Sequence, residues 1–498
     1  MIAAPAAAPA PGPDHALVTL RPGESPGAPG RGASRLVAGS RTWIVRLGEG
    51  RTLQALRADQ AVATAEPDRE RTRLAALDPL FARQPYLQQI HWTPARGARR
   101  PLVAVLDTGV DGSVPELRGQ IAPGARSFVD DTPLLDRSGH GTHVAGLIAA
   151  ATRNGIGIAG VANARILVVK VADAQGRATT STLVRGIRYA VSRHAKIINV
   201  SFGGSGFSRL EQDAILDARR AGALVIAAAG NSGRAGSPIE YPGAYRHVLA
   251  VGAVRPDGAP IIDSTRGPQV AIAAPGKRIL STARRGRFER RTGTSMATAI
   301  VSGAAARLLA QRPGLDASQL RALLISTAQD VGPTGRDDAT GWGVLNLAAA
   351  LAAPTPGRDG PEPNDDPALA RSTPEPLPGS APGEAALRGT IEEWADPKDD
   401  YRVALDQGDT LELTAQAAPG SDVDLLVWRP GAPAFRAGGD YTRQWLAAAA
   451  LGPGQTETLT YVAARSGVHT VEVKAATGRG RYRLTILRKA APPTPPAL

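Results

Sequence analysis

Three short segments carry residue types that together can perform nucleophilic catalysis. LVAVLDTGVDG places Asp107 at the end of an apolar run, SGHGTHVAGLIAA places His140 between two glycines, and RTGTSMATAIVSGAAA places Ser295 before small residues. A serine hydroxyl must lose its proton as it attacks a carbonyl, and a neutral imidazole can accept that proton. The imidazole needs a carboxylate that fixes its tautomer and stabilises the imidazolium. Asp107, His140 and Ser295 are therefore candidate catalytic residues.

Each of these residues also has a structural interpretation when it is taken alone. Asp107 at a strand end suits a turn or a cap, and Ser295 suits the N-terminal cap of a helix. His140 and His143 lie one helical turn apart and could share a metal, but no carboxylate completes a ligand set. The joint occurrence of Asp, His and Ser favours catalysis over these separate interpretations.

The order of the three residues along the chain narrows the class of enzyme. Asp, His, Ser is the order found in subtilisin, and it differs from the orders of chymotrypsin and of α/β-hydrolases. Ser295 also lacks the surrounding G-x-S-x-G pattern that is typical of lipases and esterases. DTGVDG, HGTHVAG and GTSMATA resemble the three active-site signatures of subtilisin-like serine proteases. The resemblance extends over residues 100–350 and includes NVSFGG, AAAGNSG, YPGAY, AAPG and GWGVLN.

This resemblance implies roles for residues outside the triad. Asn231 in AAAGNSG corresponds to an amide that, with the backbone N–H of Ser295, hydrogen-bonds the oxyanion of the tetrahedral intermediate. Taken alone, a Gly-Asn-Ser-Gly run is a turn former. Ser201, Phe202 and Gly203 match a segment that pairs with the substrate backbone as an added strand.

Glu240 is the candidate specificity residue. The resemblance implies that the residue before Tyr241-Pro242 lines the pocket for the side chain preceding the cleaved bond, and a carboxylate there would favour Arg or Lys. The alternative interpretation is a solvated loop carboxylate. The family also has a cis peptide at the position of Tyr241-Pro242, and we expect one here.

Glu116 and Asn154 are the candidate metal ligands. Glu116 stands where the family usually has a calcium-binding Asp, and Asn154 matches a loop residue of the same site. Both side chains offer oxygen, so the resemblance implies structural calcium, while an exposed acid and a loop Asn are the alternative. No cofactor is expected for the chemistry itself. Ala299 replaces the Pro that family members usually carry, and Ala suits the first turn of a helix.

The central region has the pattern of a doubly wound, mostly parallel α/β sheet. Its apolar runs lack strict alternation and are separated by helical patterns, so both faces of the sheet should be covered. The predicted strands are LVAVLD, ARILVVKV, IINVSF, LVIAAAG, HVLAVGAV and VAIAAP.

The flanking regions have other patterns. Two strand patterns, ALVTLRPG and TWIVRLGEG, and a helical pattern, LQALRADQAV, form a small α+β unit that resembles the family's propeptides. Alternation in GDTLELTAQ, DVDLLVW, HTVEVK and GRYRLTIL predicts an antiparallel β-sandwich, which resembles bacterial pre-peptidase C-terminal domains. The predicted segments are 1–13, disordered; 14–73, propeptide-like; 74–353, subtilisin-like peptidase; 354–383, a Pro-rich linker; and 384–490, the β-sandwich.

Composition excludes some classes of function. The 498 residues contain no cysteine, so disulfides and cysteine nucleophiles are absent, and no run of 18 apolar residues predicts a membrane span. The formal net charge of +13 raises the question of nucleic acid, but the arginines are scattered without a dense block, and we expect no nucleic-acid partner. Residues 1–13 lack the pattern of a secretory signal, so we expect an export signal upstream or already removed.

Together these patterns predict a secreted serine endopeptidase that acts as a monomer on polypeptides. Arg69, Arg71 and Arg73 lie between the propeptide-like segment and the peptidase, where an Arg-selective enzyme could process its own precursor. The alternative is a binding protein in which the peptidase fold is inactive and the C-terminal sandwich carries the function. All candidate catalytic positions are filled, which favours the enzyme.

Overall fold

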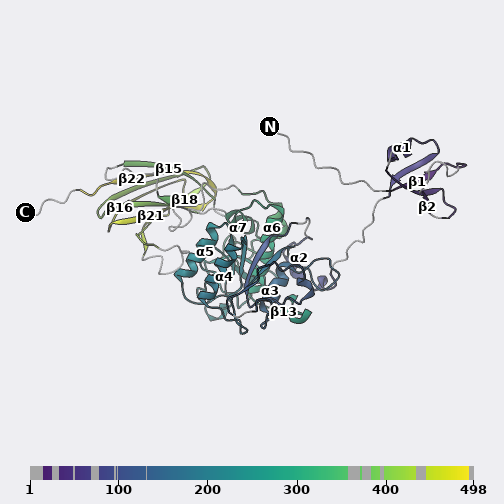
Figure 1. Cartoon of the computed structure of the whole chain (residues 1–498). Helices are drawn as coiled ribbons and strands as arrows, with labels where there is room; N and C mark the ends of the chain where they lie inside the picture. The colour runs from purple at the N-terminus through teal and green to yellow at the C-terminus, as the bar shows by residue number, and fades with distance from the viewer. Residues whose placement is uncertain are drawn as a thin grey trace, which may run out of the picture. The chain divides into compact units, whose positions relative to one another are not determined.

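The computed structural model describes residues 15–24, 33–36, 38–48, 51–68, 78–94, 97, 99–129, 132–356, 371–372, 383–392, 398–432 and 445–492. The chain divides into two units, Met1–Ala75 and Ala76–Leu498 (Figure 1). The predicted segment 1–13, most of the predicted linker 354–383, and Arg69, Arg71 and Arg73 lie outside the described residues.

The N-terminal unit is a four-stranded antiparallel sheet with one short helix. The sheet has the order β2-β3-β1-β4, and alternate residues of β1 face its core. The helix starts after Thr52, whose side chain accepts the backbone N–H of Ala55 at 3.1 Å. Its elements are β1 (His15–Leu20), β2 (Ser34–Arg35), β3 (Thr42–Arg46), α1 (Leu53–Ala58) and β4 (Val62–Pro67).

The second unit contains a seven-stranded parallel sheet in the order β11-β10-β9-β8-β5-β7-β6. All six predicted strands lie in it, and the doubly wound fold is confirmed; β6 is a short addition. The strands are β5 (Leu102–Asp107), β6 (Arg126–Ser127), β7 (Arg165–Lys170), β8 (Ile197–Val200), β9 (Leu224–Ala228), β10 (Val248–Val254) and β11 (Val270–Pro275).

Helices cover both faces of this sheet (Figure 1). Within β5, Val103 and Val105 face a core shared with α2, α3, α6, α7 and α8, whereas Ala104 and Leu106 face a core shared with α4 and α5. Burial on both faces explains why the strand sequences lack alternation. The helices are α2 (Pro85–Gln89), α3 (His140–Ala149), α4 (Thr180–Ser192), α5 (Arg209–Arg220), α6 (Thr294–Gln311), α7 (Ala317–Ser326) and α8 (Leu347–Ala352).

Helix α6 is buried along almost its whole length, and its small residues make this packing possible. It contacts β8, β9, β10 and β11 as well as α3. A Cβ atom added at Gly303 would lie 2.6 Å from Cβ of Val161, so even one methyl group would clash there. The helix ends at Gln311, just before Pro313-Gly314, where a proline cannot continue a helix. Its N-terminus is thereby held at the carboxyl edge of the sheet.

A two-stranded hairpin, β12 (Ile279–Thr282) and β13 (Phe288–Arg291), connects β11 to α6. Beyond the peptidase region, a five-stranded and a four-stranded sheet share one apolar core and form the predicted sandwich. No helix in the described ranges combines the length and apolar character needed to cross a membrane. The sandwich strands are β14 (Arg371–Ser372), β15 (Gly383–Glu392), β16 (Lys398–Leu405), β17 (Thr410–Ala417), β18 (Asp422–Trp428), β19 (Leu446–Ala450), β20 (Thr456–Val462), β21 (Gly467–Thr477) and β22 (Arg479–Lys489).

Candidate active site

Asp107 and His140 meet at the carboxyl end of the sheet. Asp107 is the last residue of β5 and is buried, and His140 is the first residue of α3. Nδ1 of His140 lies 2.7 Å from Oδ1 of Asp107, and the same oxygen accepts the backbone N–H of Thr108 at 2.8 Å. The hydrogen bond orients the imidazole and leaves its Nε2 for proton transfer, as a general base requires.

The negative charge of Asp107 raises the pKa of His140. Burial acts to lower the pKa of His140, but the nearby Asp107 carboxylate and its hydrogen bond outweigh this effect, so the pKa lies above its ordinary value. The imidazolium that forms when the base accepts a proton is therefore stabilised. A weaker opposing effect comes from the positive charge of Arg291.

Ser295 is the second residue of α6, where backbone N–H groups have no partner within the helix. Its Oγ donates a hydrogen bond to the carbonyl of Ser201 at 3.1 Å rather than to His140. The ring of Phe202, next along the chain, lies 5.9 Å from the ring of His140, centroid to centroid. The segment 201–202 thus contacts both side chains, which places Ser295 and His140 at the same sheet edge.

Asn231 follows β9 and is tied to the start of α6. Its Oδ1 accepts hydrogen bonds from the backbone N–H and the hydroxyl of Thr294, at 3.0 and 3.1 Å. Because the amide oxygen is occupied, the exposed side chain offers its Nδ2 donors next to Ser295. Together with the backbone N–H of Ser295, these donors have the chemistry of an oxyanion hole.

Glu240 is buried beside the predicted substrate-binding segment. Gly204 and Tyr241 form an antiparallel bridge, with N–H to carbonyl distances of 3.0 and 2.9 Å, and Gly203 precedes the bridge. A Cβ atom added at Gly203 would lie 2.9 Å from Oε2 of Glu240, and one at Gly230 would lie 2.3 Å from Oε1. The two glycines therefore leave the space that the carboxylate occupies.

The environment of Glu240 rules out a solvated loop carboxylate. Only 8% of the residue is exposed, and Oε1 accepts the hydroxyl of Thr265 at 2.9 Å. Among the described residues no cation lies within ion-pair distance of it, so a positive ligand would offset the loss of hydration. The expected cis peptide at Tyr241-Pro242 is confirmed.

Comparisons with known proteins show the family to which this chain belongs. The family model of the subtilase family matches residues 98–343. Subtilisin E of Bacillus subtilis is 37% identical over 305 residues, which are 60% of this chain and 78% of that protein. The chain belongs to the subtilase family. Thermitase of Thermoactinomyces vulgaris is 40% identical over 266 residues, 52% of this chain and 93% of that protein.

A third relative of the subtilase is the thermostable alkaline protease of Halalkalibacterium halodurans, which is 43% identical over 238 residues. That match spans 47% of this chain and 63% of that protein. Membership of the subtilase family makes this chain a serine endopeptidase, a hydrolase that acts on peptide bonds without a cofactor.

Asp136 supports the subtilase site and was missed by sequence reasoning. Its buried carboxylate accepts the hydroxyl of Thr108 and the backbone N–H groups of Gly139 and Thr142, each at 2.8 Å, and the hydroxyl of Thr142 at 2.7 Å. It thereby joins the turn after β5 to the N-terminus of α3, where a negative charge is favourable. The only signal in the sequence is an Asp in a turn-forming stretch before the His140 motif.

Glu116 and Asn154 lie together and are joined to each other by a hydrogen bond. Glu116 is buried, which corrects the alternative of an exposed acid. Its oxygens accept the side-chain amide N–H of Asn154 at 2.8 Å and the backbone N–H of Ile158 at 2.7 Å, where calcium would need oxygen ligands. Nearby Asp78 accepts backbone N–H groups of residues 153–155. Burial raises the pKa of Glu116 to about 7.

His143 has a structural role in the subtilase. Its Nε2 faces the carbonyl oxygens of Ile279 and Glu289 at 3.1 and 3.3 Å, and burial lowers its pKa to about 3. The neutral ring holds the β12–β13 hairpin against α3. Within the described ranges no cluster of three His, Asp or Glu side chains could hold a metal, so the metal interpretation of His140 and His143 gains no support.

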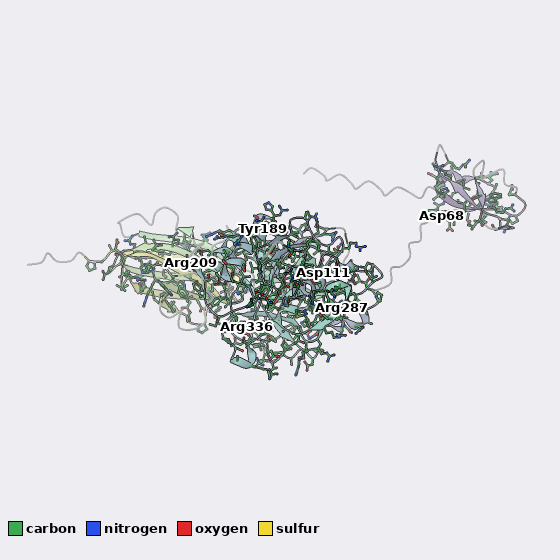
Figure 2. All side chains as sticks on the ribbon, turned by 60° about the horizontal axis from the view of Figure 1, so that its bottom comes forward. Asp68, Asp111, Tyr189, Arg209, Arg287 and Arg336 are labelled. Atoms are coloured by element: carbon green, nitrogen blue, oxygen red, sulfur yellow. The ribbon has the colours of Figure 1, made fainter. Side chains whose placement is uncertain are left out.

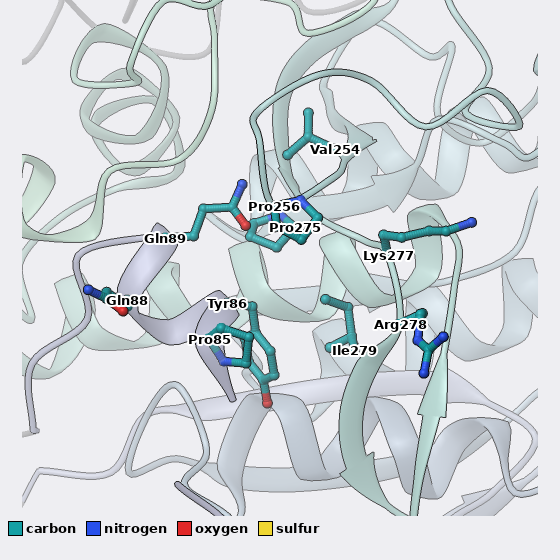
Figure 3. A pocket seen from close by; sticks show the side chains of 10 residues that line it. All are labelled: Pro85, Tyr86, Gln88, Gln89, Val254, Pro256, Pro275, Lys277, Arg278 and Ile279. Atoms are coloured by element: carbon teal, nitrogen blue, oxygen red, sulfur yellow. The ribbon is translucent and has the colours of Figure 1, made fainter. Parts of the chain in front are cut away.

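A cavity of about 280 Å³ lies apart from these residues, between α2 and the ends of β10 and β11 (Figure 3). Pro85, Tyr86 and Pro275 form its apolar walls, and Lys277 and Arg278 lie at one side. None of the candidate catalytic residues lines it.

We predict that Asp107→Asn lowers the pKa of His140, because it removes the negative charge that stabilises the imidazolium. The NMR titration of His140, recorded in a Ser295→Ala background, should move to lower pH. With Ser295 present, kcat should fall by about 10⁴-fold. The control is Asp173→Asn, a partly exposed carboxylate that pairs with Arg177 on a loop. An unchanged His140 titration would contradict the assignment of Asp107.

We predict that Asp136→Ala lowers the free energy of unfolding by about 3 kcal/mol or more, because it leaves buried N–H and O–H donors without an acceptor. Urea unfolding in the Ser295→Ala background measures this without self-digestion. Asp338→Ala, at a surface ion pair with 62% of the Asp338 side chain exposed, is the control and should change stability by about 1 kcal/mol at most. Equal effects of the two substitutions would exclude a supporting role for Asp136.

Proposed function

We propose that Ser295 is the nucleophile, His140 the general base and Asp107 its orienting carboxylate in an acyl-enzyme mechanism. The observation that carries this proposal is the 2.7 Å hydrogen bond between Asp107 and His140, at the same sheet edge as Ser295. The hydroxyl of Ser295 exchanges its bond to the Ser201 carbonyl for one to Nε2 of His140, and then attacks the substrate carbonyl.

Protons and charge then move between Ser295, His140 and the donors of the oxyanion hole. The tetrahedral oxyanion accepts hydrogen bonds from Nδ2 of Asn231 and from the backbone N–H of Ser295, aided by the N-terminus of α6. His140 passes its proton to the leaving amine as the C–N bond breaks, which leaves an ester on Ser295. A water molecule, deprotonated by His140, hydrolyses this ester and restores the enzyme.

The substrate binds as an added strand along Ser201, Phe202 and Gly203. Backbone pairing of this kind accepts many sequences, so selectivity comes from the side-chain pockets. Glu240 lies beside Gly203 and Gly230, at the inner end of the pocket for the side chain that precedes the cleaved bond. Its buried carboxylate favours Arg or Lys there, because a cationic side chain supplies the charge partner that it lacks.

The protein is made as a precursor, is exported and removes its own N-terminal unit. The separate N-terminal unit and the arginines near its end, Arg69, Arg71 and Arg73, support this part of the proposal. Polypeptides are the substrates, and the N-terminal unit is the first of them.

Self-processing predicts a difference between the wild-type protein and the Ser295→Ala variant. After identical incubation, intact-mass analysis should show that the wild type loses about its first 70 residues and that the variant does not. The new N-terminus identifies the cleaved bond. If both proteins stay full length and neither hydrolyses a denatured protein, the inactive binding protein becomes the better interpretation.

We predict that Glu240→Gly lowers kcat/KM for peptides with Arg before the cleaved bond by about 10- to 100-fold, relative to matched peptides with Leu. Glu240→Gln is the matched control for volume, since it keeps the size of the side chain and removes its charge. It should show a similar loss for Arg. An unchanged ratio of Arg to Leu cleavage in both variants would refute the role of Glu240.

A further inference from the structure

The β12–β13 hairpin and its flanks are strongly basic. Residues 277–291, KRILSTARRGRFERR, contain seven cationic side chains and one acidic side chain, Glu289. Lys277 and Arg278 lie at the cavity beside α2 (Figure 3). Three of the remaining arginines, Arg284, Arg285 and Arg287, lie in the turn of the hairpin, and Arg290 and Arg291 end β13. Figure 2 labels Arg287 together with Asp111 of the neighbouring loop.

Buried hydrogen bonds fix the hairpin against the helix that begins with His140. The hydroxyl of Ser281 donates to the carbonyl of His143 at 2.7 Å, and the hydroxyl of Thr282 donates to the carbonyl of Thr142 at 2.8 Å. Together with the ring of His143, these contacts define the position of the hairpin on α3. The arginines that the hairpin carries are therefore held in place by a buried scaffold.

Two of these arginines reach the loop directly before His140. Arg284 donates from Nη1 to the carbonyl of Arg137 at 2.5 Å, and Arg291 donates from Nη2 to the carbonyl of Ser138 at 3.3 Å. A Cβ atom added at Gly139 would lie 3.2 Å from Nη2 of Arg291 and 3.4 Å from Cγ of Arg284. Both side chains thus flank the residue that precedes the catalytic base.

The proposed mechanism defines which part of a substrate meets these arginines. Glu240 and Gly203 lie on the side of Ser295 that binds the residue before the cleaved bond. His140 must pass its proton to the leaving amine, so the chain after the cleaved bond leaves past His140. A side chain just after that bond therefore enters the region of Arg284 and Arg291.

Acidic side chains balance only part of the arginine charge in this region. Glu289 pairs with Arg291 at 2.5 Å, and Asp111 accepts the backbone N–H of Arg285 at 2.9 Å. Asp107 and Asp136 also lie beside His140, but both carboxylates are buried and hydrogen-bonded within the site. In the described part of the chain no carboxylate lies within ion-pair distance of Arg284. Its charge can therefore be paired by an acidic side chain of a substrate.

We propose that Arg284 and Arg291 form a binding subsite for an acidic side chain directly after the cleaved bond. The subsite rests on the proposed function, and it defines the preferred substrate class as polypeptides with Arg or Lys before the bond and Asp or Glu after it. The precursor contains such a bond. Arg69 is followed by Glu70, whereas Arg71 is followed by Thr72 and Arg73 by Leu74. Self-processing is therefore directed to the bond between Arg69 and Glu70.

The test uses internally quenched peptides that differ only at the residue after the cleaved bond, which is Glu, Gln or Lys, in two series with Arg or Leu before the bond. The wild type should cleave the Glu peptide about 5- to 10-fold faster in kcat/KM than the Gln peptide, and the Lys peptide more slowly than both. In Arg284→Gln/Arg291→Gln the ratio of Glu to Gln should approach one, and in Arg291→Glu the order of Glu and Lys should reverse.

Arg209→Gln is the matched control, because it removes one positive charge from an exposed ion pair on α5 and should keep the wild-type ratio. Equal cleavage of Glu and Gln peptides by the wild type, or an unchanged ratio in the double variant, overturns the subsite. If the wild type shows no preference for Arg over Leu before the bond but still prefers Glu over Gln after it, only the role of Glu240 is contradicted. Absence of all cleavage, with no labelling of Ser295 by a fluorophosphonate, means that the proposed function itself has failed.

Discussion

The site depends on the burial of one carboxylate, Asp107. A carboxylate removed from water is stabilised by donors and by a positive partner, and Oδ1 of Asp107 has these in the backbone N–H of Thr108 and the ring of His140. The turn after β5 must therefore meet the first turn of α3. Asp136 holds the two segments together from the other side, so the orientation of the imidazole is set by a hydrogen-bonded network rather than by a single contact.

The parallel sheet makes this meeting geometrically possible. Asp107 ends β5, Ser201 follows β8 and Asn231 follows β9, and all three strands run in the same direction. Their carboxyl ends consequently lie along one edge, where open α/β sheets bind ligands. Helix α6 completes the edge, because small residues along its length let it pack deeply under the sheet and bring Ser295 to the same place.

The proposed substrate preference is a consequence of charge on the two sides of Ser295. A carboxylate, Glu240, occupies space left by Gly203 and Gly230 on one side, and Arg284 and Arg291 line the other. Such a distribution would favour a substrate whose charge changes sign across the cleaved bond. It also gives the basic character of the chain a local role, since the catalytic face carries part of the excess of arginine.

The sequence alone determined the class of the protein and the candidate catalytic residues. Asp107, His140 and Ser295 each lie in a glycine-rich motif at the end of an element, and these motifs and their order can be recognised directly in the sequence. The uninterrupted apolar strands indicated a sheet covered on both faces. The cis peptide at Tyr241-Pro242 was implied by the family resemblance, which itself rests on such local motifs. Each depends on residues that are neighbours in the chain.

Only the tertiary structure decided which side chains complete the site. Contacts between segments far apart in sequence determine the position of Asp136, the arginines beside Gly139, and the burial of Glu116 and Glu240. The spacing of residues within one segment does not predict such contacts. The calcium interpretation of Glu116 and Asn154 shows the same limit, because residue type predicts an oxygen ligand but not the donors, such as the amide of Asn154, that contact it in the folded chain. Hydrogen-bond partners and burial are properties of the folded chain, and they determine what a charged residue can do.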